Sequence, residues 1–281
     1  MKKFRVLSHS LAHGTSITPR NLAQNLAADQ MLGFRGMVLV AVLVNNRYSA
    51  NAIAEPFEKI GASGLICGFI PGNGPSPFKQ PELVLKSLAP QARLAAKFAD
   101  KGLAPPVIVG PLHEHYRQKL PRNWSESMLN AWMDQLEKFL WEFGLVPYYE
   151  ALNGVEDKTP TPFHTLHRAV AGRKSGLHFD IGHARAHGLT VVDFKKMAAK
   201  IGFFEWANTG RWPLDVDLGI DYAAYAGALG ELPTNCVMAD EPFHQKVIQA
   251  FGLQKLCTTT VSGPECLVRD ADFLRSLGIM A

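Results

Sequence analysis

Residues 145–150 read LVPYYE, and residues 176–180 read GLHFD. Each is a short apolar run that ends in a carboxylate, and the length of both runs favours a buried β-strand. The stretch between them, residues 160–171, spaces its apolar side chains as an amphipathic helix does. A strand, a helix and a second strand in this order predict two parallel strands joined by a crossover helix.

The same alternation runs along the whole chain. The sequence predicts eight strands, at residues 5–9, 37–44, 63–69, 107–110, 145–150, 176–180, 202–207 and 235–241. It predicts eight helices, at residues 19–32, 49–60, 81–100, 125–143, 160–171, 190–201, 221–229 and 270–277. Eight such units favour an α/β protein made of a single (β/α)₈ TIM-barrel domain that spans residues 1–281. An open, doubly wound sheet is the alternative, but it expects a glycine-rich phosphate turn after the first strand, where residues 8–16 read SHSLAHGTS.

Composition narrows the classes of function. The chain has 281 residues, of which 47% are hydrophobic and 19% charged, with a net charge of +4. These values are typical of a globular protein, and no run of Lys and Arg forms a basic stripe for nucleic acid. The longest apolar run, residues 37–44, is much shorter than the roughly 20 residues that cross a bilayer. The four cysteines form no CxxC pair, which suits reduced thiols. We therefore expect a soluble, cytoplasmic protein that binds neither nucleic acid nor membranes.

Acidic side chains lie at the ends of four predicted strands. Functional groups of a barrel gather at the C-terminal ends of its strands. Glu150 ends the fifth strand, Asp180 the sixth and Glu241 the eighth, while Glu205 lies within the seventh. Carboxylates that converge in this way repel one another unless they surround a cation or share protons. The pattern predicts one divalent-metal site at this end of the sheet.

Each of these residues has a simpler interpretation when it is taken alone. A glutamate at a strand end is often a solvated loop residue, and His183 could cap the helix that follows Asp180. The two histidines of PLHEH, at residues 111–115, have the spacing of metal ligands but are more often solvated in a loop. Arg211 could lie on the surface. It is the ordered set of residues that favours a site.

Four motifs carry a resemblance to a known family. They are EALNGVE at residues 150–156, DIGH at residues 180–183, Arg211, and EPF at residues 241–243. In this order they resemble the xylose isomerase-like sugar isomerase/epimerase superfamily, and within it the D-tagatose 3-epimerase branch. The resemblance implies that Glu150 and Glu241 bind the metal and also act as the catalytic acid/base pair, and that Asp180 is a metal ligand. The residues that would bind the substrate are Glu156, His183 and Arg211.

Glu205 departs from the family pattern. The family normally has a histidine ligand six residues before the arginine, and this position is Glu205 here. A shell completed by Glu205 would contain four carboxylates, which favours Mn²⁺ or Mg²⁺ over Co²⁺ or Zn²⁺. A slip in the strand register would instead turn Asn208 towards the metal.

The sequence thus predicts a metal-dependent isomerase or epimerase that acts on a small sugar, ketose or sugar-like hydroxyketone through an enediolate. Epimerisation and aldose–ketose isomerisation share that intermediate, so the sequence does not separate them. The alternative is a non-catalytic metabolite-binding barrel of the same superfamily, which Glu205 supports. An endonuclease IV-like hydrolase is a remote alternative, since no HxH-type element follows Arg211. Assembly as a homodimer or homotetramer is open. Candidates for lining a sugar pocket, although barrel aromatics more often pack in the core, are Tyr148, Tyr149, Trp206 and Trp212.

Overall fold

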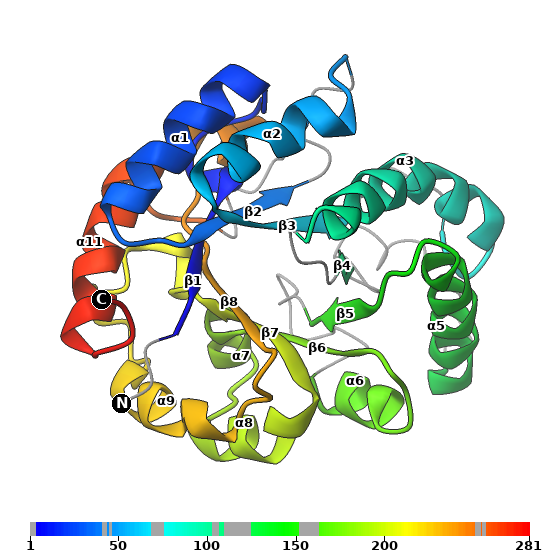
Figure 1. Ribbon diagram of the computed structural model, residues 1–281. Helices are drawn as coiled ribbons and strands as arrows, with labels where there is room; N and C mark the ends of the chain where they lie inside the picture. The colour runs from blue at the N-terminus through cyan, green and yellow to red at the C-terminus, as the bar shows by residue number, and fades with distance from the viewer. Residues whose placement is uncertain are drawn as a thin grey trace.

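The computed structural model describes residues 4–40, 44, 47–68, 76–102, 107–109, 125–151, 163–250, 254 and 257–281. Its strands are β1 (Val6–His9), β2 (Gly36–Val40), β3 (Ser63–Gly68), β4 (Val107–Val109), β5 (Pro147–Glu150), β6 (Gly176–Asp180), β7 (Ile201–Trp206) and β8 (Val237–Asp240). Each strand pairs in parallel with the next, and β8 pairs in parallel with β1, so the sheet closes on itself (Figure 1). The predicted α/β class with a parallel sheet is confirmed.

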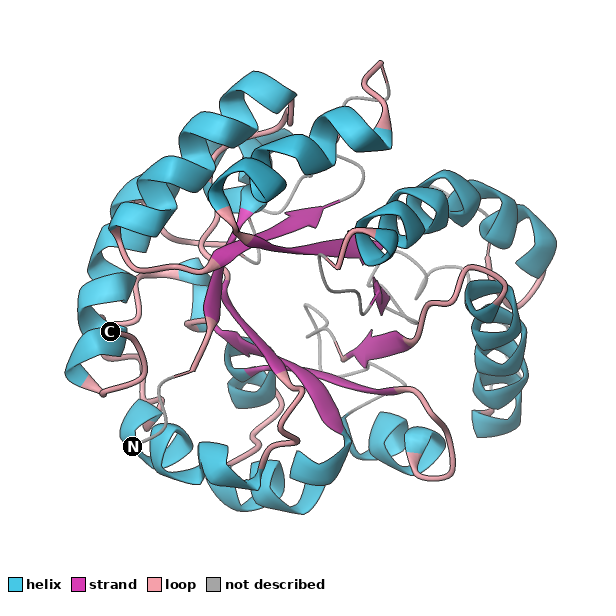
Figure 2. Ribbon diagram, viewed as in Figure 1, coloured by secondary structure: helices cyan, strands magenta, loops and turns pink. Residues whose placement is uncertain are grey.

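Helices lie outside the ring of strands and alternate with them along the chain (Figure 2). They are α1 (Pro19–Met31), α2 (Ala50–Ile60), α3 (Pro81–Asp100), α5 (Glu126–Trp141), α6 (Phe163–Val170), α7 (Ile181–Ala186), α8 (Val191–Met197), α9 (Tyr222–Ala228), α10 (Gln245–Ala250) and α11 (Gly263–Ser276). Short 3₁₀ turns are η1 (Ser10–Ala12), η3 (Ala198–Lys200), η4 (Thr209–Arg211) and η5 (Leu229–Glu231). No helix in the described part of the chain is long and apolar enough to cross a membrane.

Local chemistry decides where the helices begin. Thr18 accepts the backbone N–H of Asn21, and the Asn21 side chain accepts that of Thr18, so this reciprocal cap starts α1 where it is predicted. The predicted start of the last helix, residue 270, is wrong. That helix, α11, begins at Gly263, because Ser262 accepts the N–H of Glu265 and Pro264 occupies the first turn. Helices α7 and α10 were not predicted either.

A small apolar cluster fills the space enclosed by the strands. Its members alternate along β1, β2, β7 and β8 with residues of the larger core, so the two sets face opposite sides of the sheet. The ring of Tyr148 packs against this cluster, and a Cβ atom placed on Gly202 would lie only 1.9 Å from its Cε1 atom. The absence of a side chain at Gly202 therefore makes room for the ring. The buried members of the cluster are Leu7, Val38, Phe203 and Ala239.

The larger core lies between the sheet and the helices. Phe204 packs edge-on against Trp206, with ring centroids 5.0 Å apart, and both side chains are fully buried. Tyr149 is also fully buried, and its hydroxyl donates to Glu137 Oε1 at 3.1 Å. A role for Tyr149 and Trp206 in lining a sugar pocket is therefore wrong, because both belong to the packed core.

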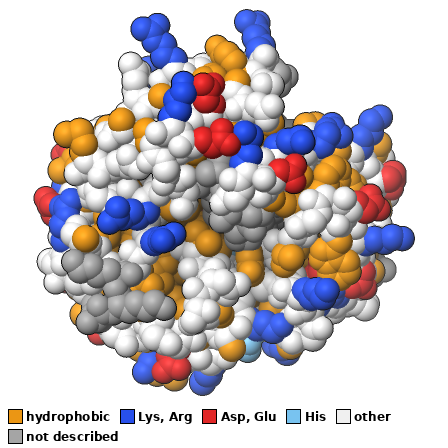
Figure 3. All heavy atoms as spheres, in the orientation of Figure 1, with side chains coloured by type: hydrophobic (Ala, Val, Ile, Leu, Met, Phe, Trp, Pro, Cys, Tyr) orange, Lys and Arg blue, Asp and Glu red, His pale blue; other side chains and the backbone are white. Residues whose placement is uncertain are grey.

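Charged side chains are mixed on the surface. On the face seen in Figure 3, Lys and Arg side chains are spread over several elements with Asp and Glu side chains between them. This distribution agrees with the small net charge of +4.

Candidate active site

The C-terminal ends of β5 to β8 bring four predicted acidic residues together. Glu150 ends β5, Asp180 ends β6, Glu205 is the penultimate residue of β7, and Glu241 directly follows β8. Asp180 and Glu205 are register partners in neighbouring strands. Asp180, Glu205 and Glu241 are each at most 9% exposed. Glu156 and the PLHEH segment lie outside the described residues.

A tight turn after β7 directs Arg211 into this group. Gly210 and Arg211 both have a left-handed backbone, with φ of 67° and 61°, which is uncommon for a residue other than glycine. The Gly210 carbonyl accepts two backbone N–H groups from residues 258–259, and the Asn208 amide donates to two carbonyls of the following loop. Asn208 is therefore bound within the loop, and the alternative register that turns it towards the metal is wrong.

The Arg211 guanidinium joins two of the acidic residues. Its Nη1 donates to Asp180 Oδ2 at 2.7 Å, and its Nη2 lies 2.5 Å from Glu241 Oε2. Its Cζ atom lies 5.0 Å from the centre of the Phe243 ring. Burial opposes the charge, but Asp180 and Glu241 raise the pKa of Arg211 well above its ordinary value. Arg211 is 7% exposed and stays cationic, so the surface alternative for this residue is wrong.

His183 lies between Arg211 and Glu150. Its Nε2 is 3.2 Å from Arg211 Nη2 and 3.3 Å from Glu150 Oε1. Its backbone N–H donates to Asp180 Oδ1 at 2.8 Å, so Asp180 caps α7 and turns the His183 ring back over the strand ends. Although burial opposes ionisation, Arg211 and His183 hold the pKa of the Asp180 carboxyl well below its ordinary value. The same holds for Glu150, whose pKa is lowered by His178 and His183.

Two further histidines lie in the site without having been assigned to it. His178 Nε2 is 2.6 Å from Glu205 Oε2, and His9 Nε2 is 3.8 Å from Glu205 Oε1 and from Glu241 Oε1. Both imidazoles are at most 2% exposed. The signal for His178 was its position two residues before Asp180, which puts both side chains on the same face of β6.

The site contains four carboxyl groups and one arginine, so the positive charge of Arg211 cannot neutralise all of them if they ionise. Burial raises the pKa of Glu205 well above its ordinary value, and Asp180 and Glu150 add to that rise. Burial likewise raises the pKa of Glu241, which Arg211 opposes and Glu205 reinforces. Burial is thus the main cause of the raised pKa of both Glu205 and Glu241, and the neighbouring carboxylates add to it, as expected where carboxylates converge.

Three groups of side chains could each hold a cation, because the ligand atoms within each group lie within 4.8 Å of one another. They are His9 with Glu205 and Glu241, Glu150 with Asp180 and His183, and Glu150 with His178 and Glu205. Glu150 and Glu205 each belong to two groups, but within the described chain no single group contains all four predicted carboxylates. The four predicted ligands therefore lie near one another but are divided among three groups that share Glu150 and Glu205.

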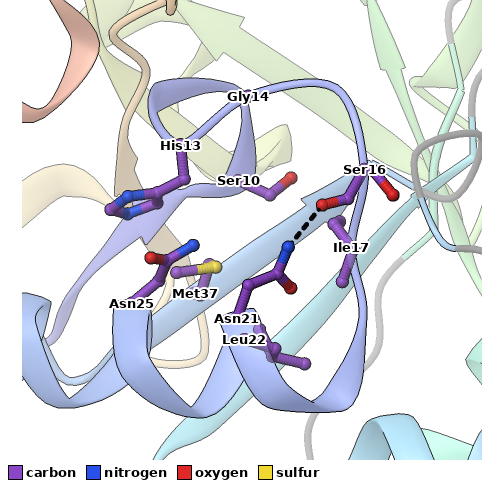
Figure 4. Close-up of a pocket in the computed structure, with 9 residues that line it drawn as sticks. All are labelled: Ser10, His13, Gly14, Ser16, Ile17, Asn21, Leu22, Asn25 and Met37. Carbon is purple, nitrogen blue, oxygen red and sulfur yellow. Dashed lines mark hydrogen bonds between the residues drawn. The ribbon is translucent and has the colours of Figure 1, made fainter.

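A small surface pocket beside β1 is separate from this site (Figure 4). It lies between the turn after β1 and the start of α1, where the Asn21 amide donates to the Ser16 carbonyl at 2.8 Å. None of its lining residues is a predicted site residue. They are Ser10, His13, Gly14, Ser16, Ile17, Asn21, Leu22, Asn25 and Met37.

Comparison with known proteins finds likeness in structure. No family model matches the chain, and no curated protein matches its sequence. The chain is similar to the structure of an L-ribulose 3-epimerase, with a TM-score of 0.79 and 18% identity over 98% of this chain and 94% of that one. It is similar to D-allulose 3-epimerase from Methylomonas sp., with a TM-score of 0.74 and 11% identity over 99% of both chains. It is also similar to 3-keto-D-glucoside 4-epimerase from E. coli, with a TM-score of 0.66 and 17% identity over 92% of this chain and 100% of that one.

At these identities the likeness shows the fold. A xylose isomerase domain-containing protein from Salmonella typhimurium is a further structural neighbour, with a TM-score of 0.68 and 13% identity over 99% of this chain and 98% of that one. Sugar epimerases and xylose isomerase-like domain proteins are the kinds of protein that the sequence motifs resemble. The chain therefore shares the fold of the kinds of protein that its sequence motifs resemble.

Proposed function

We propose that the chain is a divalent-metal-dependent sugar isomerase or epimerase, built as the (β/α)₈ barrel that the closed order of its eight strands suggests. Its substrate would be a small sugar, ketose or sugar-like hydroxyketone. The predicted homodimer or homotetramer and the substrate-binding role of Glu156 stay predictions.

One observation carries the proposal, a continuous line of contacts that joins the two candidate bases. Glu150 Oε1 lies 3.3 Å from His183 Nε2, which lies 3.2 Å from Arg211 Nη2, which lies 2.5 Å from Glu241 Oε2. The carboxyl groups of Glu150 and Glu241 therefore lie at the two ends of this line, and the nitrogen atoms of His183 and Arg211 between them can bind substrate oxygens. Proton transfer at carbon requires a base on one side, an acid on the other, and groups that stabilise the charge developing on oxygen.

The side chains fit a divalent cation. The buried atoms His178 Nδ1 and Glu205 Oε1 have no hydrogen-bond partner in the structure, and unpartnered buried acceptors are costly. Glu150, Asp180 and Glu241 would hold the ion, and the sequence predicts Glu205 as a fourth ligand. When bound, the ion would supply a Lewis acid that polarises the substrate carbonyl.

The protein's own groups would then divide the work. We assign proton removal from the carbon beside the carbonyl to one of the pair Glu150 and Glu241, and proton return to the other. His183 and Arg211 would hold the substrate oxygens, so that the enediolate forms in a fixed orientation. Return of the proton to the same carbon from the opposite face gives epimerisation, and its return to the neighbouring carbon gives isomerisation.

A second candidate is a non-catalytic barrel that binds a metabolite. The observation that favours it is the pairing of Arg211 with Asp180 and Glu241, because the guanidinium already supplies a cation to two of the proposed metal ligands. In that case Arg211 would take the place of the ion.

A panel of ketoses and inososes incubated with the protein and Mn²⁺ in heavy water separates the two candidates. The enzyme adds one deuterium to its substrate, which mass spectrometry detects, and a stereoisomer or an aldose accumulates. Exchange that chelation abolishes and Mn²⁺ restores supports the proposal. Binding of a panel member without any exchange, with or without Mn²⁺, favours the non-catalytic barrel.

A further inference from the structure

His178 occupies the interior of the barrel, directly beside the proposed site. It is 2% exposed and is the register partner of both Glu150 on β5 and Phe203 on β7. The Phe203 ring meets the imidazole edge-on, with centroids 4.7 Å apart and planes at 67°. The Phe203 ring and the burial of His178 therefore restrict rotation of this imidazole.

The two ring nitrogens of His178 have different surroundings. Nε2 lies 2.6 Å from Glu205 Oε2, whereas Nδ1 is buried, has no hydrogen-bond partner in the structure, and lies 3.7 Å from Glu150 Oε2. A proton on Nε2 satisfies Glu205 and leaves the lone pair of Nδ1 directed at Glu150. An unpartnered lone pair that faces a carboxylate oxygen is unfavourable, and a cation bound between the two atoms would relieve the repulsion.

This arrangement is the one that metal-binding histidines adopt. A ligating imidazole usually donates its other N–H to a carboxylate, which fixes the tautomer and increases the basicity of the ligating nitrogen. His178 Nδ1 and Glu150 Oε2 lie 3.7 Å apart, which is close enough for one cation to be bound by both atoms.

The other two imidazoles of the site have no free lone pair of this kind. His9 Nδ1 accepts the backbone N–H of Leu11 at 3.2 Å, so neutral His9 carries its proton on Nε2 and can only donate towards Glu205 and Glu241. His183 Nε2 lies 3.2 Å from Arg211 Nη2 and 3.3 Å from Glu150 Oε1, so this nitrogen already contacts two groups. Of these three histidines, His178 is the one with a buried ring nitrogen, Nδ1, that has no hydrogen-bond partner in the structure.

We infer that His178 Nδ1 is the imidazole ligand of the divalent ion and that Glu205 acts through His178, as the carboxylate that orients it, instead of binding the ion directly. The inference rests on the proposed function. In this account the imidazole comes from β6, and Glu205 on β7 holds it in place through Nε2. A shell that contains an imidazole prefers Mn²⁺, Co²⁺ or Zn²⁺ over Mg²⁺, whereas a shell of four carboxylates has no such preference for the softer ions.

Metal affinity in the full chain tests the inference without any substrate. Co²⁺ and Mg²⁺ binding are compared by calorimetry and chelator competition in the wild type, His178→Gln and Glu205→Gln, with His13→Gln as a control in a histidine outside the site. Glutamine at 178 reaches the position of Nε2 and keeps the contact with Glu205, but it lacks the Nδ1 donor. We expect His178→Gln to weaken Co²⁺ binding by more than about 100-fold, since loss of an outer partner alone costs about 10- to 100-fold.

The two site variants should then differ in a defined order. Glu205→Gln still offers an oxygen to His178, so its loss of Co²⁺ affinity should be about 10-fold. His13→Gln should bind as the wild type does. A larger loss in Glu205→Gln than in His178→Gln overturns the inference and leaves the proposed function standing. Wild type that binds neither ion overturns both.

A spectroscopic measurement covers the case in which His178→Gln does not fold. Proton NMR of the Co²⁺-loaded wild type should show one strongly shifted, exchangeable imidazole N–H, that of His178 Nε2. In Glu205→Gln the signal should remain but exchange faster with water, because its hydrogen bond is weaker. Absence of such a signal in the wild type, or its persistence in a folded His178→Gln, overturns the inference.

Discussion

Two pairs of histidine and acid, one between the turn after β1 and helix α1 and the other between β6 and β7, differ in the polar atoms that they leave unpartnered. In the first, His13 Nε2 lies 3.0 Å from Asp29 Oδ2, the oxygen to which the Ser8 hydroxyl also donates. In the second, His178 Nε2 lies 2.6 Å from Glu205 Oε2. The first pair leaves no buried polar atom unpartnered among the described residues, whereas the second leaves both His178 Nδ1 and Glu205 Oε1 without a partner.

The difference separates a structural pair from a functional one. His13 and Asp29 tie the turn after β1 to the end of α1, because Asp29 Oδ2 lies 3.0 Å from His13 Nε2 and also accepts the Ser8 hydroxyl. The His178 and Glu205 side chains are only 3% and 1% exposed, against 11% and 3% for His13 and Asp29, and His178 also lies 3.7 Å from a second acid, Glu150. An imidazole–carboxylate contact is thus common to both pairs, and the unpartnered atoms His178 Nδ1 and Glu205 Oε1 distinguish the second.

The largest effect, on turnover, is expected at Glu150 and Glu241, the two glutamates of the candidate site that we assign to proton transfer. Glutamine keeps the shape of Glu150 or Glu241 and one metal-binding oxygen but cannot move a proton. Glu150→Gln and Glu241→Gln should each lower turnover by at least about 100-fold, the usual scale for a general acid or base. Steady-state rates at confirmed metal content measure this.

Glu137→Gln is the matched control for these two variants. Glu137 is a buried glutamate of the core that accepts from Tyr149 and Ser175, so its loss should reduce stability and leave turnover unchanged. A glutamine variant of Glu150 or Glu241 that keeps its metal and turns over at the parent rate contradicts the assigned roles.

A smaller effect, on stability, should distinguish the two histidine pairs. Asp29→Ala leaves Ser8 and His13 without their shared acceptor, and we expect the free energy of unfolding to fall by about 2 kcal/mol. Glu205→Gln removes one acid from a crowded group, so the free energy of unfolding should not fall. Urea denaturation of both metal-free variants measures the contrast. Equal losses in the two variants would remove the distinction between the pairs.

The smallest effect concerns a third buried acid, Asp270, which has no histidine partner. Burial raises the pKa of Asp270 to about 8, although its Oδ1 accepts the N–H of Leu214 at 2.6 Å. A pKa above the ordinary value means that the folded chain binds the extra proton. The stability from this group is therefore complete below about pH 4 and is lost as the pH rises to about 8.

Asp270→Asn should reduce that pH dependence. Asparagine keeps an oxygen for Leu214 and carries no charge, so the fall in melting temperature between pH 5 and pH 8 should be smaller than in the wild type. Thermal unfolding of the variant and the wild type at both pH values gives the comparison. Parallel pH profiles for the two proteins would mean that Asp270 does not titrate in this range.

Much of the fold follows from sequence because alternation and helix caps are local signals. The strand ends at Glu150 and Asp180 are predicted to the residue, and the cap at Thr18 places the start of α1. The start of α11 at Gly263 was missed, although Ser262 and Pro264 are a local signal for it. The short helix α7 was missed because six residues hold too little periodicity to detect.

The acidic residues of the candidate site were predicted from the sequence, whereas the histidines His178 and His9 were not. Period-2 alternation puts His178 and Asp180 on one face of β6, so His178 could have been recognised as inward-facing. Which of its nitrogens is free could not, because that depends on the Glu205 contact and on the packing of Phe203 across strands. The same limit applies to His9, whose tautomer is decided by the Leu11 N–H two residues on.

Titration of Mn²⁺ into chelator-treated protein tests most directly whether a cation binds beside His178 Nδ1 and Glu205 Oε1, the two unpartnered atoms of the second pair. Calorimetry should give one ion per chain, and Mn²⁺ at about 100 times its dissociation constant should stabilise the folded chain by about 2.7 kcal/mol, seen as a rise in melting temperature. No binding heat together with an unchanged melting temperature would contradict the account and leave Arg211 as the cation of the site.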